Sequence, residues 1–226
     1  YQIKGIRELE NLRNIQKKDL RVVGCPYLDV LSEKLKELPE KKNAFTVLIA
    51  PSWGANGILS KYGEQLITPL VETGWNIIIR PHPQSKASEA DMLKKLEEKY
   101  KSAANAVWDY NPENINSLSE ADIMISDFSS VIFDYCFLFD KPFLYCNSEF
   151  DHRPYDSGDL KETTWKFSVL KEIGVELNSI KEIISETCKS ETLKENRLKA
   201  KDTAWQNRGH AGEAVYTFLT ELRKTW

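Results

Sequence analysis

The sequence predicts an α/β protein with a doubly wound, Rossmann-like parallel sheet. Short apolar runs alternate along the chain with segments in which apolar residues recur at helical spacing, which is the pattern of β-α units. The run 121–125 is short and apolar, as in a strand buried on both faces of a parallel sheet. With 226 residues, 41% of them hydrophobic, the chain is long enough to bury a full core.

Each element has its own signal. Runs of apolar, β-branched and aromatic residues that end at glycine, proline or polar loops predict strands. Such runs lie at 20–24, 45–50, 75–80, 106–108, 121–125 and 141–146, with a further edge strand around 175. Amphipathic periodicity predicts helices. It is found at 3–18, 28–38, 58–73, 92–100, 115–119, 130–139, 179–205 and 211–226. Residues 150–165 are polar and aromatic with little periodicity, which predicts a long loop near the site.

Composition excludes several classes of function. The net charge of −3 gives no support for a nucleic-acid partner, which normally requires a basic face. No run of about 18 apolar residues and no charged-then-apolar leader occurs, so neither a membrane span nor a secretory signal is expected. The four cysteines have no metal-ligand spacing and are interpreted as reduced core thiols, which suits the cytosol.

The most informative segment is the strand-loop-helix unit at 121–139. Asp127, Ser129 or Ser130 can cap the helix, whose N–H groups and positive dipole end attract an anion. The hydroxyls of Ser129 and Ser130 can donate to phosphate oxygens, and Asp127 is a further candidate for substrate binding. Asp134 lies about one turn into the helix, where its carboxylate can reach the hydroxyls of an attached ribose. A plain helix cap without any ligand is the structural alternative.

A second feature follows the strand at 75–80. Arg80 ends this strand, and His82 stands between two prolines that restrict the backbone and so fix where the ring points. His82 is therefore a candidate general acid or phosphoryl ligand. A histidine that only bonds to loop carbonyls is the alternative.

A third loop, at 51–57, also follows a predicted strand. Its glycines permit close backbone approach to a ligand, while Ser52 offers a hydroxyl and Trp53 a stacking face. Considered alone, the loop is equally consistent with a flexible turn. Its interest comes from its neighbours, because three strand-end loops in succession carry chemistry that suits a phosphate or a base.

These motifs, in this order, resemble the C-terminal half of the CDP-glycerol glycerophosphotransferases, the family of teichoic-acid polymerases and primases. The resemblance is carried by 23–26, 49–53, 80–83, 126–135 and 141–145, and it covers roughly 22–155. It implies the nucleotide-binding, C-terminal lobe of a glycosyltransferase-B architecture. Residues 1–21 are then an incoming helix and linker from an N-terminal lobe, and residues 22–226 are the donor-binding domain with its C-terminal helices.

The resemblance also implies roles for residues. His82 matches a histidine that acts on the phosphoryl group, Ser129 and Ser130 match phosphate-binding serines, and Asp134 matches an acidic position suited to the ribose. The implied reaction is in-line attack by an acceptor hydroxyl on the β-phosphorus of CDP-glycerol, with CMP released. Arg80, His82 and the helix end would stabilise the charge, and no cofactor or metal ion is expected.

The chain departs from the family pattern at two positions. Where the family has Gly-x-Pro-Arg-Asn-Asp, this chain has Tyr27 in place of the arginine, and where the family has Pro-Thr-Trp-Arg, it has Gly54. The family's presumed base belongs to the N-terminal lobe, for which the chain has no sequence. We therefore expect this chain alone to bind donor without turning it over.

Two other functions stay open. One is a nucleotide-sugar glycosyltransferase or a UDP-sugar epimerase of the same architecture, and base preference separates it from a CDP-polyol enzyme. The other is a noncatalytic nucleotide-binding module. The expected partners are a CDP-linked polyol donor and a polymer or lipid-linked acceptor. The expected location is the cytoplasm, and peripheral contact with the inner face of the cell membrane and the oligomeric state are left open.

Overall fold

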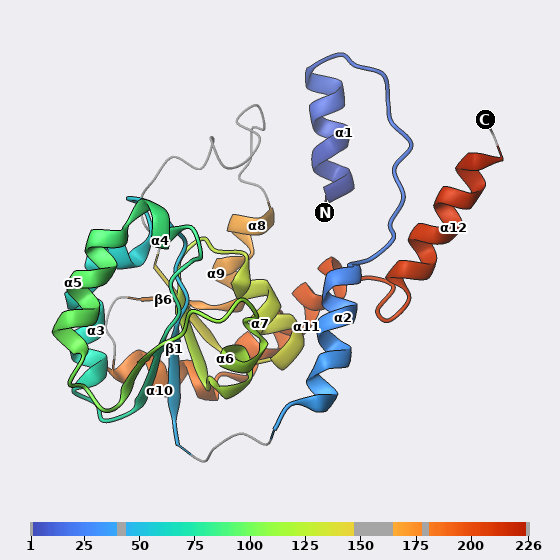
Figure 1. Ribbon diagram of the computed structural model, residues 1–226. Coiled ribbons are helices and arrows are strands. Elements are labelled where there is room, and N and C mark those ends of the chain that lie inside the picture. Colours follow the sequence, from blue (N-terminus) through green and yellow to red (C-terminus); the bar gives the residue numbers. More distant parts are fainter. Residues whose placement is uncertain (1, 40–43, 147–164, 178–180, 225–226) are drawn as a thin grey trace.

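The computed structural model describes residues 2–39, 44–146, 165–177 and 181–224, and its centre is a parallel sheet (Figure 1). The strand order is β3-β2-β1-β4-β5-β6, and every pair is parallel. The strands are β1 Thr46–Ile49, β2 Asn76–Ile79, β3 Ala106–Trp108, β4 Ile123–Ser126, β5 Phe143–Tyr145 and β6 Val175–Glu176. From β1 the sheet extends in one direction through β2 and β3. The chain then returns to the other side of β1, where β4, β5 and β6 follow, so the sheet is doubly wound as predicted.

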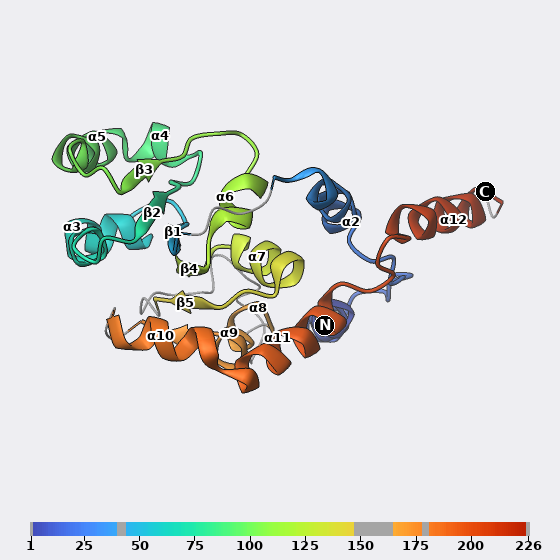
Figure 2. The ribbon, with the colours of Figure 1, turned by 90° about the horizontal axis from the view of Figure 1, so that it is seen from below.

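Helices cover both faces of this sheet, as Figure 2 shows from below. The helices are α1 Gln2–Leu12, α2 Pro26–Lys34, the 3-10 helix η1 Leu35–Glu37, α3 Ile58–Val71, α4 Ser85–Ser88, α5 Ala90–Tyr100, α6 Ile115–Glu120, α7 Val131–Phe139, α8 Trp165–Ser168, α9 Leu170–Ile173, α10 Lys181–Lys189, α11 Glu191–Ala204 and α12 Ala211–Arg223. None of the described helices is long and apolar enough to cross a membrane.

The two faces of the sheet carry two separate cores because side chains alternate along each strand. In β4, Met124 packs with α2, α6, α7 and α11, whereas Ile123 and Ile125 pack with α3 and α5. All three side chains are completely buried. The predicted apolar strands therefore form the centre of the domain, and the further strand expected near 175 is present as β6 at the sheet edge.

Two predictions near the N-terminus are wrong. The helix expected over 3–18 ends at Leu12, because Asn14 adopts a positive φ of 49° and the Glu10 carboxylate accepts a hydrogen bond from the N–H of Lys18. The strand expected at 20–24 does not form. Its Val22 carbonyl accepts from the Asn207 side chain, and Gly24 has a φ of 94°, which a strand residue cannot adopt.

The C-terminal predictions need one correction. The helix expected over 179–205 is broken at Ser190, whose hydroxyl caps α11 by accepting from the N–H of Leu193. The long loop predicted at 150–165 lies outside the described residues except for Trp165, which begins α8.

The four cysteines, which were interpreted as reduced core thiols, are free thiols, but only Cys136 is fully buried.

Helix α2 is tied to the junction between α11 and α12. The two carboxylate oxygens of Asp29 accept from the Trp205 indole at 2.7 Å and from the N–H of Ala211 at 3.0 Å. A Cβ atom on Gly24 would lie 2.3 Å from the carbonyl oxygen of Gln206, so only glycine permits this close approach. These contacts join segments far apart in the sequence and hold α2 beside the sheet.

Candidate functional site

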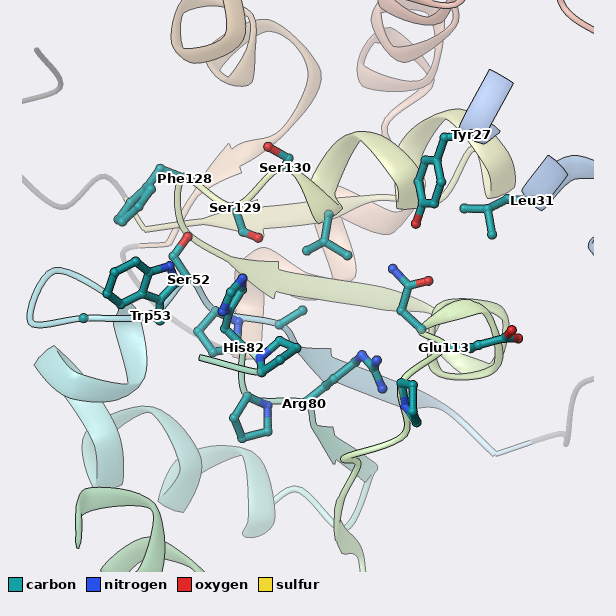
Figure 3. A pocket seen from close by; sticks show the side chains of 18 of the residues that line it. Tyr27, Leu31, Ser52, Trp53, Arg80, His82, Glu113, Phe128, Ser129 and Ser130 are labelled. Atoms are coloured by element: carbon teal, nitrogen blue, oxygen red, sulfur yellow. The ribbon is translucent and has the colours of Figure 1, made fainter. Parts of the chain in front are cut away.

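A cavity of about 700 Å³ opens at the carboxyl ends of β1, β2 and β4 (Figure 3). It lies where the strand order reverses, between β1 and β4, which is where open α/β sheets bind ligands. Its lining comes from one face of α2 at 27–34, from the loops at 50–54, 80–83, 112–114 and 128–131, and from Lys166. Of the eight residues predicted for the site, the six that line this cavity are Ser52, Trp53, Arg80, His82, Ser129 and Ser130.

The N-terminus of α7 faces this cavity with both predicted serines. Ser130 is the N-cap residue, yet its side chain makes no capping hydrogen bond. Among the described residues, the N–H groups of Ser130 and Val131 have no backbone acceptor, as is usual in the first turn of a helix. Figure 3 shows the Ser129 hydroxyl directed into the cavity and the Ser130 hydroxyl directed away from it. One hydroxyl and two N–H donors therefore face the cavity at the positive end of the α7 dipole, an arrangement suited to an anion.

Asp127, which was also predicted to bind substrate, lies beneath the cavity instead of lining it. It is 1% exposed, and its carboxylate accepts from the N–H groups of Ser52, Ile58 and Ser129 at 2.9 to 3.1 Å. Burial raises the pKa of Asp127, and these donors oppose the rise. Its role in the structure is to hold the loop after β1 against the loop after β4.

Arg80 lines the cavity but its cation is already paired. The guanidinium forms an ion pair with Asp109 and donates to the carbonyl oxygen of Asn111 at 2.6 Å. The Asp109 side chain is 9% exposed. Its pKa is lowered because hydrogen bonds from Ser117, Asn111 and Arg80 outweigh the opposing effect of burial. Arg80 therefore holds the loops after β2 and β3 together, and its positive charge is largely neutralised by the ion pair with Asp109.

His82 has a defined orientation in the cavity. Its Nδ1 atom accepts from the N–H of Gln84 at 3.1 Å, so the proton of the neutral ring is carried by Nε2. The imidazole and Trp53 lie next to each other, with ring centroids 6.4 Å apart, and Trp53 is 49% exposed. Figure 3 shows both rings on the side of the cavity away from α2. His82 can thus present an N–H donor to a ligand oxygen without losing its own anchor.

Asp134 lies just behind the cavity wall, between α2 and α6. Tyr27 and Asn114, two residues that line the cavity, lie beside its carboxylate. Burial raises the pKa of Asp134 to about 6, against the lowering effect of those two side chains. A ligand hydroxyl that reaches this carboxylate has to replace or join Tyr27 and Asn114.

Several lining residues were missed from the sequence. They are Tyr27, Lys34, Glu113, Asn114 and Lys166. Only Tyr27 had a signal, because it stands in the motif at 24–29 where the resembled family has arginine. The other four lie on elements whose approach to the cavity depends on tertiary packing. The described residues contain no cluster of histidine, cysteine and carboxylate side chains arranged to hold a metal ion.

The fold and the cavity define an α/β domain of the doubly wound class with an anion-suited site at its switch point. The chain belongs to the CDP-Glycerol:Poly(glycerophosphate) glycerophosphotransferase family, which it matches over residues 6–216. The predicted resemblance is thereby confirmed, and this family is one of transferases. No curated protein matches the chain.

Solved structures are similar to this chain at low sequence identity. The wall teichoic acid polymerase TagF is 18% identical, with 85% of this chain and 46% of that chain covered and a TM-score of 0.48. The Methanocaldococcus jannaschii UDP-GlcNAc 2-epimerase, in complex with UDP-GlcNAc and UDP, is 18% identical, with 92% and 57% covered and a TM-score of 0.54. The chain thus spans about half the length of these proteins, and the likeness to the epimerase confirms the Rossmann-like fold class.

Proposed function

We propose that this chain is the donor-binding domain of a glycerophosphotransferase that uses CDP-glycerol or a related CDP-polyol. The enzyme would transfer the polyol phosphate to a polymer or lipid-linked acceptor such as teichoic acid. One observation carries the proposal: in a chain of this family, the serine pair at the α7 N-terminus and His82 line one cavity at the switch point of the sheet.

The cavity suggests how a CDP-polyol would lie. The diphosphate is placed over the first turn of α7, where Ser129, Ser130 and the free N–H groups donate to its oxygens. The ribose is placed towards Asp134, which lies about one turn further along α7. The polyol phosphate then points the other way, towards His82 and Trp53.

The reaction proposed for this site is an in-line phosphoryl transfer. An acceptor hydroxyl attacks the β-phosphorus, its oxygen forms the new bond, and the bond from the β-phosphorus to the bridging oxygen breaks as CMP leaves. The hydroxyl proton passes to a general base, which we propose lies in the other lobe. His82 donates its Nε2–H to a phosphoryl oxygen, and the α7 end stabilises the charge that develops.

The charge on the phosphates would be met mainly by neutral donors. Arg80 is engaged by Asp109, so the donors that we propose for the phosphates are hydroxyls, backbone N–H groups and the dipole of α7. This differs from the direct role of Arg80 that we expected from the sequence. We further propose that the protein works at the cytoplasmic side of the membrane, with residues 1–21 as the connection to an acceptor-binding lobe.

Calorimetric titration tests the proposal. The ligands are CDP-glycerol, CDP, UDP and UDP-N-acetylglucosamine, and the test variant is Ser129→Ala/Ser130→Ala. Ser102→Ala, at an exposed position away from the cavity, is the matched control. We expect cytidine-selective binding that the double variant loses and the control keeps.

The other outcomes point to the alternatives. A preference for UDP ligands would replace the proposal by a nucleotide-sugar enzyme. Binding that survives in the double variant would reduce the serine pair to a helix cap. No binding by the wild-type chain would count against a donor site that works without the second lobe.

A further inference from the structure

The two ends of the cavity differ in chemistry. At one end, Trp53 and His82 stand on loops after β1 and β2, whereas at the other end α2 presents Tyr27 and Leu31 (Figure 3). Tyr27 is 53% exposed although it lies beside Asp134. Its ring therefore offers an accessible aromatic surface at a fixed place in the cavity.

We propose that the α2 face formed by Tyr27, Val30, Leu31 and Lys34, with Glu113 opposite, is the nucleobase subsite, and that the Lys34–Glu113 pair selects cytosine over uracil. This inference rests on the proposed function. It assigns the base of the donor to residues to which the sequence motifs give no role.

The polarity of α7 places the base at this end. If phosphates occupy the helix N-terminus at Ser129 and Ser130, the ribose is directed towards Asp134, and the base continues beyond it. Tyr27 of α2 lies beside Asp134 and lines the cavity, so the next surface in that direction is α2. The opposite orientation would put the base against Trp53 and leave the transferred group away from His82.

Helix α2 is held in place and can serve as a packing surface for a base. Leu28 and Leu31 are buried, with 6% and 7% of their surface exposed, and Asp29 is anchored to Trp205 and Ala211. Val30 remains 57% exposed while lining the cavity. A planar base can pack on Tyr27 and the apolar side chains beside it without any rearrangement of the helix.

The ion pair on the rim has the correct chemistry for cytosine. The Lys34 ammonium and the Glu113 carboxylate are 2.7 Å apart and come from α2 and the loop before α6. Cytosine presents an amino donor at N4 beside acceptors at N3 and O2, so a carboxylate can accept from N4 and an ammonium can donate to N3 or O2. Uracil places a carbonyl oxygen where the amino group would be, which a carboxylate repels.

The test measures the affinities of CDP, UDP and ribose 5-phosphate by calorimetry for the wild-type chain and four variants. The variants are Tyr27→Leu, Tyr27→Phe, Lys34→Met and Glu113→Gln. The neighbouring pair Lys36–Glu33 is exposed and does not line the cavity, so Lys36→Met and Glu33→Gln are matched controls. Urea unfolding midpoints verify that each variant is folded as the wild type is.

We expect Tyr27→Leu to weaken CDP binding by about tenfold or more through loss of stacking, whereas Tyr27→Phe keeps most of the affinity. Lys34→Met and Glu113→Gln should reduce the ratio of CDP to UDP affinity by roughly tenfold, the scale of one good base contact. Ribose 5-phosphate binding should change little in the pair variants, and the two controls should behave as the wild type.

The results separate this inference from the proposed function. If CDP binds and Ser129→Ala/Ser130→Ala abolishes that binding, but the Tyr27 and ion-pair variants leave the CDP and UDP affinities unchanged, the base subsite is elsewhere and the proposed function stands. Equal affinity for CDP and UDP in the wild type overturns the selection by Lys34 and Glu113. A wild-type chain that binds none of the three ligands overturns both.

Discussion

Ser52 and Asp127 are joined by two hydrogen bonds across 75 residues of sequence, because the Ser52 N–H donates to both carboxylate oxygens at 2.9 and 3.0 Å. The same carboxylate accepts from the N–H groups of Ile58 at 3.0 Å and Ser129 at 3.1 Å. One buried side chain thus fixes the start of α3, the Trp53 loop and the serine loop. The relative position of the cavity's parts depends on it.

Asp127→Asn should therefore destabilise the fold although it preserves size. The new amide group places a donor where N–H groups already point, so at least one buried donor loses its acceptor. We expect a loss of about 1 to 3 kcal/mol in the free energy of unfolding, measured by urea denaturation. Asp19→Asn, at an exposed position, is the control. Equal unfolding curves for the two variants would show that the three donors do not depend on the charge.

Arg80 and Asp109 should be energetically coupled. Their side chains are 11% and 9% exposed, so removing one leaves the other poorly solvated. We expect Asp109→Asn to cost about 3 kcal/mol of stability, and Arg80→Met/Asp109→Asn to cost less than the sum of the single changes. A double-mutant cycle from urea unfolding gives the coupling energy. Strictly additive losses would mean that the pair contributes nothing beyond the separate contacts.

His82 should matter for transfer and little for folding. His82→Ala removes the Nε2–H donor but no core contact, since the side chain is only partly buried. In a transfer assay with the acceptor lobe present, we expect the rate to fall by roughly 10² to 10⁴, with CDP affinity nearly unchanged. His210→Ala, on an exposed histidine, is the matched control. An unchanged rate in His82→Ala would favour a noncatalytic nucleotide-binding module.

Local pattern was sufficient for the sheet and for the serine loop. Ile77 and Ile79 are apolar, β-branched and buried, and the strand that they predict is β2. Ser129 and Ser130 follow a strand and precede a helix, so their place at the cavity also followed from the order of elements. In both cases the determining contacts are close in sequence or are imposed by the parallel sheet.

Residues whose role depends on distant partners were not predictable in the same way. Arg80 was expected to stabilise charge on the phosphates, and its ion pair with Asp109 was not foreseen. Asp109 is 29 residues away and is brought to Arg80 only by the pairing of β2 with β3. Tyr27 reaches the cavity because α2 is held by Trp205 through Asp29. The strand expected at 20–24 is absent for the same reason, since Gly24 packs on the 206–211 segment.

Gly24→Ala tests how the docking of α2 depends on this contact. Gly24 has a φ of 94°, and an added Cβ would meet backbone at 2.3 Å, whereas Gly74 has a φ of 76° with open space around it. Gly74→Ala should therefore cost only the backbone strain, about 1 to 2 kcal/mol. Gly24→Ala should cost more and should also change the fluorescence of Trp205. If both variants lost a similar free energy of unfolding in urea, the backbone at Gln206 would be able to move aside at little cost.

Asp134 should give the fold a distinct dependence on pH. Burial raises the pKa of this carboxyl to about 6, above the ordinary value of 3.8. A carboxyl with a raised pKa in the folded state favours folding while it is protonated. The stabilisation that protonated Asp134 adds to the free energy of unfolding is therefore fully present below about pH 4 and is lost as the pH rises through 6. Asp109 and Glu89, whose pKa values are lowered, act in the opposite direction below pH 4.

Comparison of the wild type with Asp134→Asn isolates this effect, because all other carboxyl groups are common to both chains. Between pH 4.5 and pH 7.5 the free energy of unfolding of the wild type should fall relative to the variant by on the order of 2 kcal/mol, from 1.36 kcal/mol for each pKa unit. The amide can still accept from Tyr27 and Asn114, so the variant should remain folded. Urea unfolding at both pH values measures the difference. Parallel pH profiles would mean that water reaches the Asp134 carboxylate freely, and that it is ionised at neutral pH without cost.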